Sequence, residues 1–355
     1  MHICHVNLAS GFSGGEKQTL VLLTQQRSMG YQLTVVANPV SPFFKQAEAL
    51  GCKMIAAKSI WRAHKKAVTQ HCDVMHAHEG KAIYWAFLQK WCFSAPYIIT
   101  RRIDNPLKRK WLSEQAYKHA SHIVGVSKAV VHEVIKRHPK ANCSFIPDSP
   151  ARYPTNLNNV QKIRAQYQDK FLVIKAAKHL KHKGFDVAIN AARLLQSHSD
   201  SIHFVLLGSG PEEQALKALA ADLNNLSFAG NQSNMGDWYA AANLLIHSSY
   251  TEGMGSVILE AMAAGLPVIG SKAGGIPDVI KNEESGLLFE VGSSEQLASS
   301  ILRIFNDSAL RTRLIEGANH HLHQFEIATT AISYQNLYSI YSEKLKNESD
   351  LPRNL

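Results

Sequence analysis

The feature that most constrains the fold is a regular alternation of short apolar runs with longer amphipathic segments, which occurs twice along the chain. Buried parallel strands joined by crossover helices produce this pattern, because both faces of such a sheet are covered. The alternation therefore predicts an α/β protein with two doubly wound domains. In the first half, the expected strands are Ile3–Val6, Leu33–Ala37, Lys53–Ala56, Val74–Ala77, Tyr97–Thr100 and Ile123–Val126, separated by expected helices such as Glu16–Met29, Ala82–Trp91 and Ser127–Arg137.

A proline-rich segment separates the two halves. Three prolines within the eight residues Pro147–Pro154 break any regular element and predict a linker. The expected domains are residues 1–150 and 151–326, followed by a last long helix within 327–355. In the second domain, the expected strands are Phe171–Ala176, Ile202–Leu207, Leu226–Phe228, Leu244–His247 and Pro267–Ile269, and the expected helices include Phe185–Leu195, Glu212–Ala221 and Ser256–Ala264.

The positive charge of the chain is concentrated in the first half. The whole chain has 38 Lys+Arg and 28 Asp+Glu, a formal net charge of +10. Residues 1–150 hold 20 Lys+Arg against 8 Asp+Glu, a net +12, whereas residues 151–355 hold 18 against 20, a net −2. This asymmetry predicts that the two domains bind different partners.

Several classes of protein are excluded or disfavoured. No apolar run approaches the roughly 18 residues that span a bilayer, and the N-terminus has no charged leader followed by an apolar stretch. The five cysteines are scattered without a C-x-x-C pair, which predicts buried free thiols in a reducing cytoplasm. No D-x-D triplet is present.

The most specific stretch contains two glutamates separated by seven residues. Glu252 lies on a glycine-rich turn after an expected strand, and Glu260 lies about one turn inside the next helix. Free backbone N–H groups at the start of this helix form an anion site, and a carboxylate one turn further in can accept bonds from ribose hydroxyls. A capped helix with two exposed glutamates is the structural alternative. The expected binding residues of the turn are Gly253, Met254, Gly255, Ser256 and Val257.

This stretch resembles the E-x7-E signature of the retaining glycosyltransferase family 4, and further motifs of that family follow one another along most of the chain. These motifs are the glycine pair Gly14-Gly15, the strand-end segment Val74–His78, the clamp Lys178–Gly184, the turn Leu206–Pro211 and the segment Ala273–Asp278. The resemblance implies the GT-B fold, in which two Rossmann-like domains face a central cleft and a C-terminal helix returns to the N-terminal domain.

The clamp resembles an Arg-x4-Lys-Gly motif, with Lys178 in the place of the arginine. Two cations there would offset the charge that builds on a leaving nucleoside diphosphate. Lys178 supplies a positive charge but, unlike arginine, cannot make two parallel hydrogen bonds to one phosphate group. Spacing alone fits a solvated basic loop equally well. The resemblance assigns Lys178 and Lys183 to the diphosphate, Glu252 to hydroxyls of the donor sugar, Glu260 to ribose and His78 to the reacting sugar.

The other candidates are less specific. Gly14 and Gly15 allow close approach of a phosphate or sugar, and Gly208 and Gly210 would line the nucleotide base. Arg101 binds the donor phosphate or an anionic acceptor, or pairs with Asp104. His78 is one of 18 histidines, so it could also be incidental.

The resemblance implies transfer of a sugar from a nucleotide sugar, taken as a UDP-sugar, to an acceptor hydroxyl with retention at the anomeric carbon and without a metal or other cofactor. The basic first domain would hold an anionic glycolipid or oligosaccharide, such as the lipopolysaccharide core, and contact the cytoplasmic face of a bacterial inner membrane. No nucleic-acid motif is present. A nucleotide-sugar epimerase of the same fold and an inactive nucleotide-sugar-binding protein are the alternatives.

Overall fold

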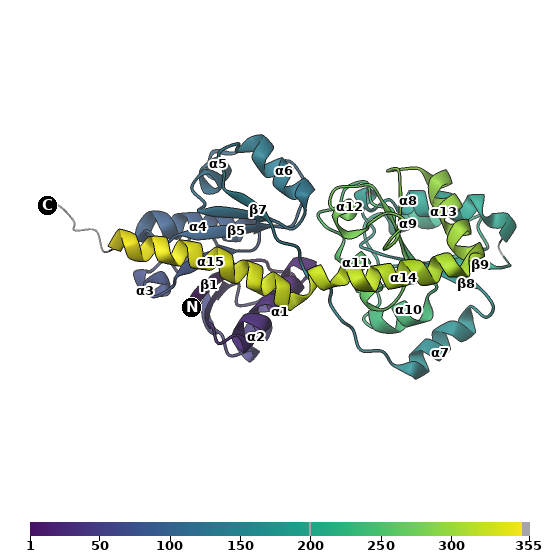
Figure 1. Cartoon of the computed structure of the whole chain (residues 1–355), viewed down its shortest axis with the longest axis horizontal. Helices are drawn as coiled ribbons and strands as arrows, with labels where there is room; N and C mark the ends of the chain where they lie inside the picture. The colour runs from purple at the N-terminus through teal and green to yellow at the C-terminus, as the bar shows by residue number, and fades with distance from the viewer. Residues whose placement is uncertain (199, 350–355) are drawn as a thin grey trace. The chain divides into compact units, whose positions relative to one another are not determined.

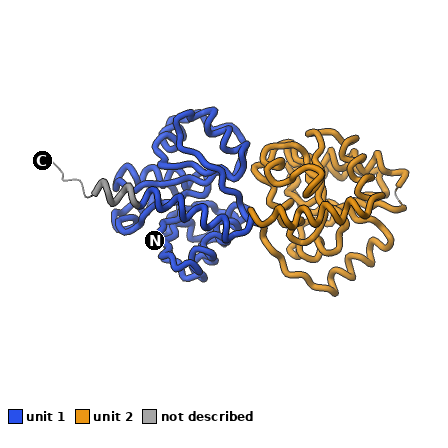
Figure 2. Tube along the Cα trace, viewed as in Figure 1, with its two compact units in different colours: residues 1–149, 325–355 blue, residues 150–324 orange. Residues whose placement is uncertain are grey.

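The computed structural model divides the chain into two compact units, each built on one parallel sheet (Figure 1). It describes residues 1–198 and 200–349, with side chains up to Ser342. Unit 1 comprises Met1–Ser149 and the chain from Phe325 onward, and unit 2 comprises Pro150–Gln324 (Figure 2). The two α/β units agree with the predicted fold class.

The sheet of unit 1 has seven parallel strands in the order β3-β2-β1-β4-β5-β6-β7. The order reverses beside β1, which pairs with β2 on one side and with β4 on the other. In a doubly wound sheet, ligands bind outside the carboxyl ends of the strands at such a reversal. The strands are β1 (His2–Asn7), β2 (Gln32–Ala37), β3 (Lys53–Ala56), β4 (Val74–Ala77), β5 (Tyr97–Arg101), β6 (His122–Gly125) and β7 (Cys143–Phe145).

Helices cover both faces of this sheet and bury two apolar layers. One layer includes residues of α4, whereas the other includes residues of α1, α2 and the long α15. The tyrosines Tyr334 and Tyr338 of α15 are buried in that second layer. The helices of unit 1 are α1 (Gly14–Ser28), α2 (Pro42–Ala49), α3 (Lys66–Thr69), α4 (Gly80–Phe93), α5 (Trp111–Lys118), α6 (Lys128–Arg137) and α15 (Ile327–Ser349). The short η3 (His323–Phe325) spans the boundary at which unit 2 ends and unit 1 resumes.

Unit 2 has six parallel strands in the order β10-β9-β8-β11-β12-β13, and here the order reverses between β8 and β11. Its strands are β8 (Phe171–Ala176), β9 (Ile202–Leu207), β10 (Leu226–Gly230), β11 (Leu244–His247), β12 (Val268–Ser271) and β13 (Leu287–Phe289). Its helices are α7 (Leu157–Gln166), η1 (Lys181–Lys183), α8 (Phe185–Leu194), η2 (Gln196–His198), α9 (Glu213–Leu219), α10 (Met235–Ala241), α11 (Ser256–Ala263), α12 (Ile276–Val279), α13 (Ser294–Asn306) and α14 (Ser308–Leu322).

The expected strands of both halves are present, most of them within one or two residues of the observed bounds. The strands that were not predicted are β7 and β13, which have three residues each and lie at sheet edges. Within the described part of the chain, no helix is long and apolar enough to cross a membrane.

Candidate functional site

The end of β11 and the segments that follow β8 and β11 bring a lysine, a glutamate and a histidine together at the strand reversal of unit 2. Lys183 Nζ lies 2.7 Å from Glu252 Oε2, and His247 Nε2 lies 2.7 Å from the same oxygen. The backbone fixes this arrangement, because Gly275 N–H donates to the Glu252 carbonyl and Tyr250 N–H to the His182 carbonyl. Two of the predicted site residues, 69 positions apart in the sequence, thus form one cluster.

The cluster keeps Glu252 ionised. Burial alone would raise the pKa of this carboxyl, but the hydrogen bond from His247 and the ion pair with Lys183 hold the pKa well below its usual range. The side chains of Lys183 and Glu252 are 20% and 13% exposed, so the pair is only partly screened by water. A carboxylate and an ammonium are therefore held side by side within reach of solvent.

A second lysine, Lys175, lies fully buried at the end of β8. Its Nζ has no hydrogen-bond partner among the described residues and lies 4.7 Å from the centre of the Phe185 ring. Burial lowers the pKa of Lys175 to about 7, and the nearby charge of Lys183 acts in the same direction. Unit 2 therefore holds a buried amine that can titrate near neutral pH.

The other lysine of the clamp, Lys178, is exposed, whereas the glycines of the turn after β9, Gly208 and Gly210, are closely packed. Lys178 is exposed in the loop between β8 and η1. Gly208 has φ +127°, and a Cβ there would lie 1.9 Å from the Ala177 carbonyl oxygen, while a Cβ at Gly210 would lie 2.5 Å from the His179 carbonyl oxygen. Packing against the loop after β8 accounts for both glycines, whether or not a nucleotide base also lies there.

The start of α11 carries the glycine-rich turn. Gly253, Met254 and Gly255 are buried, Ser256 and Val257 are partly exposed, and Gly255 has φ +87°. The first N–H groups of an α-helix have no partner within the helix, so those of Ser256 and Val257 are the natural anion donors here.

The second glutamate of the motif has a different environment from the first. Glu260 is buried and accepts a 2.8 Å hydrogen bond from the Tyr239 hydroxyl. Burial and the proximity of Glu260 raise the pKa of Tyr153 to about 12. These three side chains line a cavity of about 290 Å³ together with residues of the linker and of α10 and α11. The two glutamates are thus placed for different contacts.

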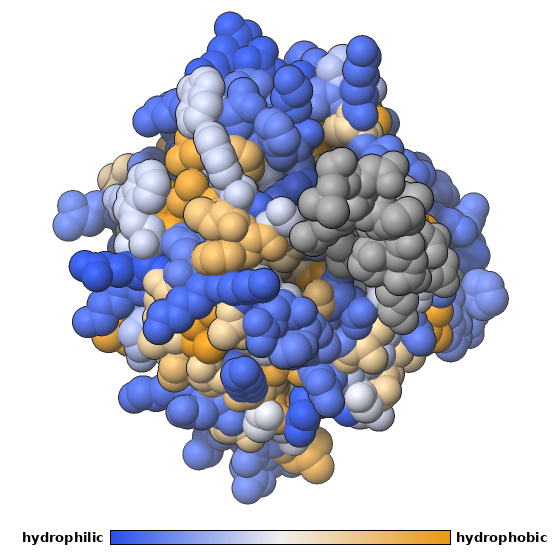
Figure 3. Space-filling model, turned by 90° about the vertical axis from the view of Figure 1, so that its left-hand side faces the viewer, coloured by the Kyte–Doolittle hydropathy of each residue, from blue (hydrophilic) through white to orange (hydrophobic). Residues whose placement is uncertain are grey.

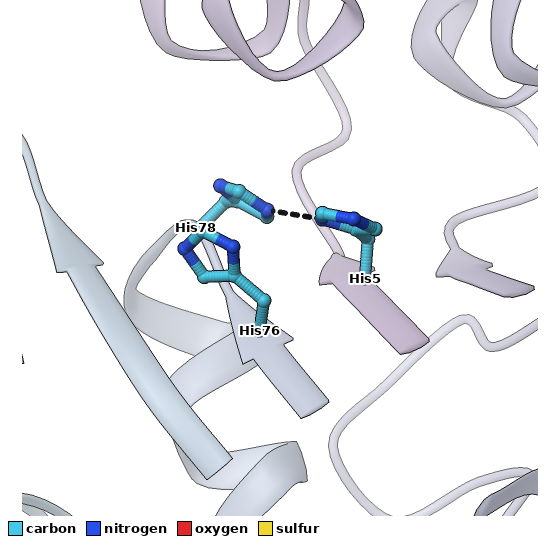
Figure 4. Close-up of side chains that lie close together, drawn as sticks. All are labelled: His5, His76 and His78. Atoms are coloured by element: carbon cyan, nitrogen blue, oxygen red, sulfur yellow. Dashed lines mark hydrogen bonds between the residues drawn. The ribbon is translucent and has the colours of Figure 1, made fainter. Parts of the chain in front are cut away.

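In unit 1, three histidines gather at the carboxyl ends of β1 and β4, beside the strand reversal (Figure 4). His5 pairs in register with His76, and His78 follows β4. All three are buried, and the ring centroids of His76 and His78 are 3.9 Å apart. Burial lowers the pKa of His5 to about 3 and lowers those of His76 and His78 well below the usual value, so the imidazoles are neutral at pH 7.

Hydrogen bonds connect this cluster to α1, β5 and α15. His5 Nδ1 lies 2.8 Å from His78 Nε2, and His5 Nε2 lies 2.8 Å from Gln26 Oε1. His76 Nδ1 contacts the Tyr338 hydroxyl at 2.7 Å, and His76 Nε2 contacts the Thr100 hydroxyl at 2.6 Å. His78 Nδ1 has no partner among the described residues. Each ring nitrogen of His5 and His76 is thus engaged, and only His78 has a free nitrogen.

A metal ion is the obvious candidate ligand for such a group, because one nitrogen from each ring lies within 4.8 Å of the others. The donor set does not fit well, since a metal would displace hydrogen bonds that His5 and His76 already make with Gln26, Thr100 and Tyr338. The residues of this cluster are arranged as a hydrogen-bonded network.

The remaining candidates of unit 1 lie around this cluster. Gly14 and Gly15 form the first turn of α1, and a Cβ on Gly15 would make only ordinary contact with Arg102, at 3.7 Å. Arg101 is buried and donates to the Tyr117 hydroxyl and the Asn105 carbonyl. Its neighbour Arg102 pairs with Asp148 at 3.0 Å. Neither arginine contributes an exposed charge to the basic surface.

The site residues that were not predicted from the sequence are His5, Lys175, His247 and Tyr239. Two of them carry a detectable signal, because a polar or charged residue interrupts an otherwise apolar strand: His5 in β1 and Lys175 in β8. Such a residue on a buried parallel strand requires a partner or a function. Tyr239 lies on a helix, and its contact with Glu260 could be found only from the structure.

Residues 158–321 match the model of a protein family described as "Glycosyl transferases group 1". This part of the chain, which is less than half of its length, is similar to that family. It covers α11, η1 and the Lys183–Glu252–His247 cluster, so the match confirms the predicted resemblance where the site residues of unit 2 lie.

Known proteins resemble the chain in sequence and in fold. It is 27% identical over 225 residues to N-acetyl-alpha-D-glucosaminyl L-malate synthase of Bacillus anthracis, covering 61% of this chain and 58% of the relative. It is 34% identical over 157 residues to the lipopolysaccharide core biosynthesis glycosyltransferase LpsE of Rhizobium meliloti, covering 43% and 45%. The matches thus span about half the length of these relatives.

A solved structure resembles nearly the whole chain. HepE of Anabaena, in a complex with UDP, has a TM-score of 0.82 at 18% identity and covers 96% of this chain and 100% of HepE. This similarity confirms the predicted GT-B fold with its two Rossmann-like domains.

Proposed function

We propose that the chain is a glycosyltransferase that moves a sugar, with retention, from a UDP-sugar to a hydroxyl of a lipid-linked or lipopolysaccharide core acceptor. The Lys183–Glu252–His247 cluster carries this proposal, because it lies at the strand reversal of unit 2 and within the family match. The UDP bound to HepE and the lipopolysaccharide role named for LpsE support the choice of donor and acceptor.

Unit 2 would hold the donor through charges and backbone dipoles. Lys183, oriented by its ion pair with Glu252, would lie against the diphosphate, with the exposed Lys178 as a second cation. The free N–H groups at the start of α11 would bind diphosphate oxygens. These donors stabilise the negative charge that grows on the leaving diphosphate, which is the task that a metal performs in other transferases.

The two glutamates would bind different parts of the donor. Glu252 is ionised and partly exposed, so it can accept bonds from hydroxyls of the sugar. Glu260 lies in the cavity beside Tyr239, where a carboxylate can accept bonds from the ribose hydroxyls. With retention, the leaving diphosphate takes the proton of the acceptor hydroxyl as that oxygen attacks the same face, so positioning and charge stabilisation are the main tasks of the protein.

Unit 1 would hold the acceptor and contact an anionic membrane surface on its cytoplasmic side. A depression of about 680 Å³ lies beside β3, with an apolar wall that includes Met54 and Ile55. On the face in Figure 3, hydrophobic side chains form patches among strongly hydrophilic ones. Exposed lysines with apolar neighbours suit an anionic lipid surface. The basic lining residues are Lys58, Arg62 and Lys65, and the exposed tryptophans of unit 1 are Trp61, Trp91 and Trp111.

A thermal-shift panel of UDP-, GDP- and ADP-sugars, followed by turnover with candidate acceptors, tests the proposed activity. We expect UDP-sugars to raise the melting temperature most, and we expect turnover to require an acceptor hydroxyl and to keep the anomeric configuration in the product. Release of free epimerised sugar without an acceptor would indicate the epimerase instead. Binding without transfer or hydrolysis would indicate an inactive binding protein.

A further inference from the structure

The free ring nitrogen of His78 is a candidate contact for a ligand. His78 is only 4% exposed, and its Nδ1 is buried without a partner among the described residues. Burying a polar atom without a hydrogen bond is costly, so such atoms in native proteins call for an explanation. The side chain lies at the strand reversal of unit 1, where a ligand of a doubly wound domain is expected.

The neighbours of His78 determine which kind of ligand atom fits. Gln26 presents its Oε1 to His5 and its Nε2 to the Tyr338 hydroxyl. An amide oxygen only accepts hydrogen bonds, so His5 Nε2 carries a hydrogen and donates to Gln26. His5 is neutral at pH 7, so its Nδ1 then has a lone pair and accepts.

The tautomer of His5 in turn determines the tautomer of His78. Because His5 Nδ1 accepts, the 2.8 Å contact requires that His78 Nε2–H donates. Neutral His78 then has a lone pair on Nδ1, so this nitrogen accepts a hydrogen bond and cannot donate one. Figure 4 shows the two rings joined by this bond, with the other side of His78 turned away from His5.

We propose that Gln26 and His5 are positioning residues that fix the tautomer of His78, so that its buried Nδ1 accepts a hydrogen bond from a substrate hydroxyl. The nature of that substrate, a sugar or sugar acceptor, rests on the proposed function. A phosphate oxygen does not fit, because it is a hydrogen-bond acceptor and His78 Nδ1 is an acceptor as well. The hydrogen bonds that link Gln26, His5 and His78 thereby select a hydroxyl over an anion at this position.

Substitutions of His5 separate the tautomer effect from a loss of packing. His5→Asn places an amide oxygen near the position of Nδ1 and can still accept from His78, whereas His5→Leu removes the acceptor. Both variants lose the same bond to Gln26, so each is the stability control for the other. Similar melting temperatures are expected for the pair.

The first readout is the protonation of His78 itself, followed in the full chain labelled with 15N-histidine at pH 8. Nitrogen–proton correlation spectra distinguish a protonated Nε2 from a protonated Nδ1, and loss of signals in His78→Ala assigns the residue. We expect protonated Nε2 in the wild type and in His5→Asn, and a mixture of tautomers in His5→Leu. A wild-type His78 protonated on Nδ1 would overturn the proposal, whatever the activity of the protein.

The second readout is kinetic and uses the UDP-sugar and acceptor that support turnover. His5→Leu should lower kcat/KM about tenfold, while His5→Asn should stay within about threefold of the wild type. If His5→Leu raises KM for the UDP-sugar, the hydroxyl that contacts His78 belongs to the donor. If it raises KM for the acceptor, that hydroxyl belongs to the acceptor. Equal kinetics for the two variants would contradict the role of His5 in positioning His78.

Discussion

Removing the buried amine of Lys175 should stabilise the protein in a manner that depends on pH. In the substitution Lys175→Met, a thioether of similar length replaces an ammonium group that has no partner among the described residues. The pKa of Lys175 is lowered to about 7 by burial, whereas an unfolded lysine has a pKa of about 10.4. Between these values the unfolded chain binds a proton that the folded chain lacks.

The sign and size of the change in stability follow from the difference between the folded and unfolded pKa of Lys175. Wild-type stability should rise with pH through this window, because unfolding takes up a proton. At and below pH 7 the cost of burying the charge is greatest, and a shift of this size corresponds to about 5 kcal/mol. The advantage of Lys175→Met over the wild type should therefore shrink by about 2 kcal/mol between pH 7 and pH 9.

Urea unfolding of both proteins, followed by circular dichroism at pH 7, 8 and 9, measures this change. Lys162→Met removes an exposed amine from α7 and controls for the loss of one positive charge. Taking differences between variants cancels the titration of the other groups. A stability gap between Lys175→Met and the wild type that stays constant across this range would contradict the lowered pKa of Lys175, since it would mean that the folded protein keeps the amine protonated.

Two further predictions concern other parts of the molecule. Gly208→Ala should lower the free energy of unfolding by more than about 2 kcal/mol, because its φ of +127° and the carbonyl oxygen of Ala177 exclude a side chain; an unchanged melting temperature would argue against this packing. The wild type should sediment with anionic but not neutral vesicles, and Lys65→Gln should weaken that binding about fivefold while Lys162→Gln does not. Equal binding to neutral vesicles would contradict the proposed membrane surface.

The fold was largely predictable because hydrophobic periodicity and turn residues are local signals. The run Phe171–Ala176 forms β8 with the expected bounds, and Leu244–His247 forms β11. The short strands Cys143–Phe145 and Leu287–Phe289 were missed, because three residues cannot display a period and their pairing with a neighbouring strand decides their conformation.

The site was predictable only where a motif with fixed spacing exists. Lys183 and Glu252 were both predicted to bind the donor, but their mutual ion pair depends on how the loops after β8 and β11 meet. The series of hydrogen bonds from Gln26 through His5 to His78 joins three elements that are distant in sequence. Its direction follows from hydrogen-bond chemistry in three dimensions, which no local pattern encodes.

The proposed function depends most on the Lys183–Glu252–His247 cluster, which would support sugar transfer. Turnover of a UDP-sugar by Glu252→Gln tests it most directly, with Lys217→Met as the control, because Lys217 also makes a 2.7 Å ion pair with a glutamate but on the exposed surface of α9. We predict that Glu252→Gln lowers kcat by about a hundredfold or more with the fold intact, and that Lys217→Met matches the wild type. A Glu252→Gln enzyme within a few fold of wild-type turnover would contradict the account.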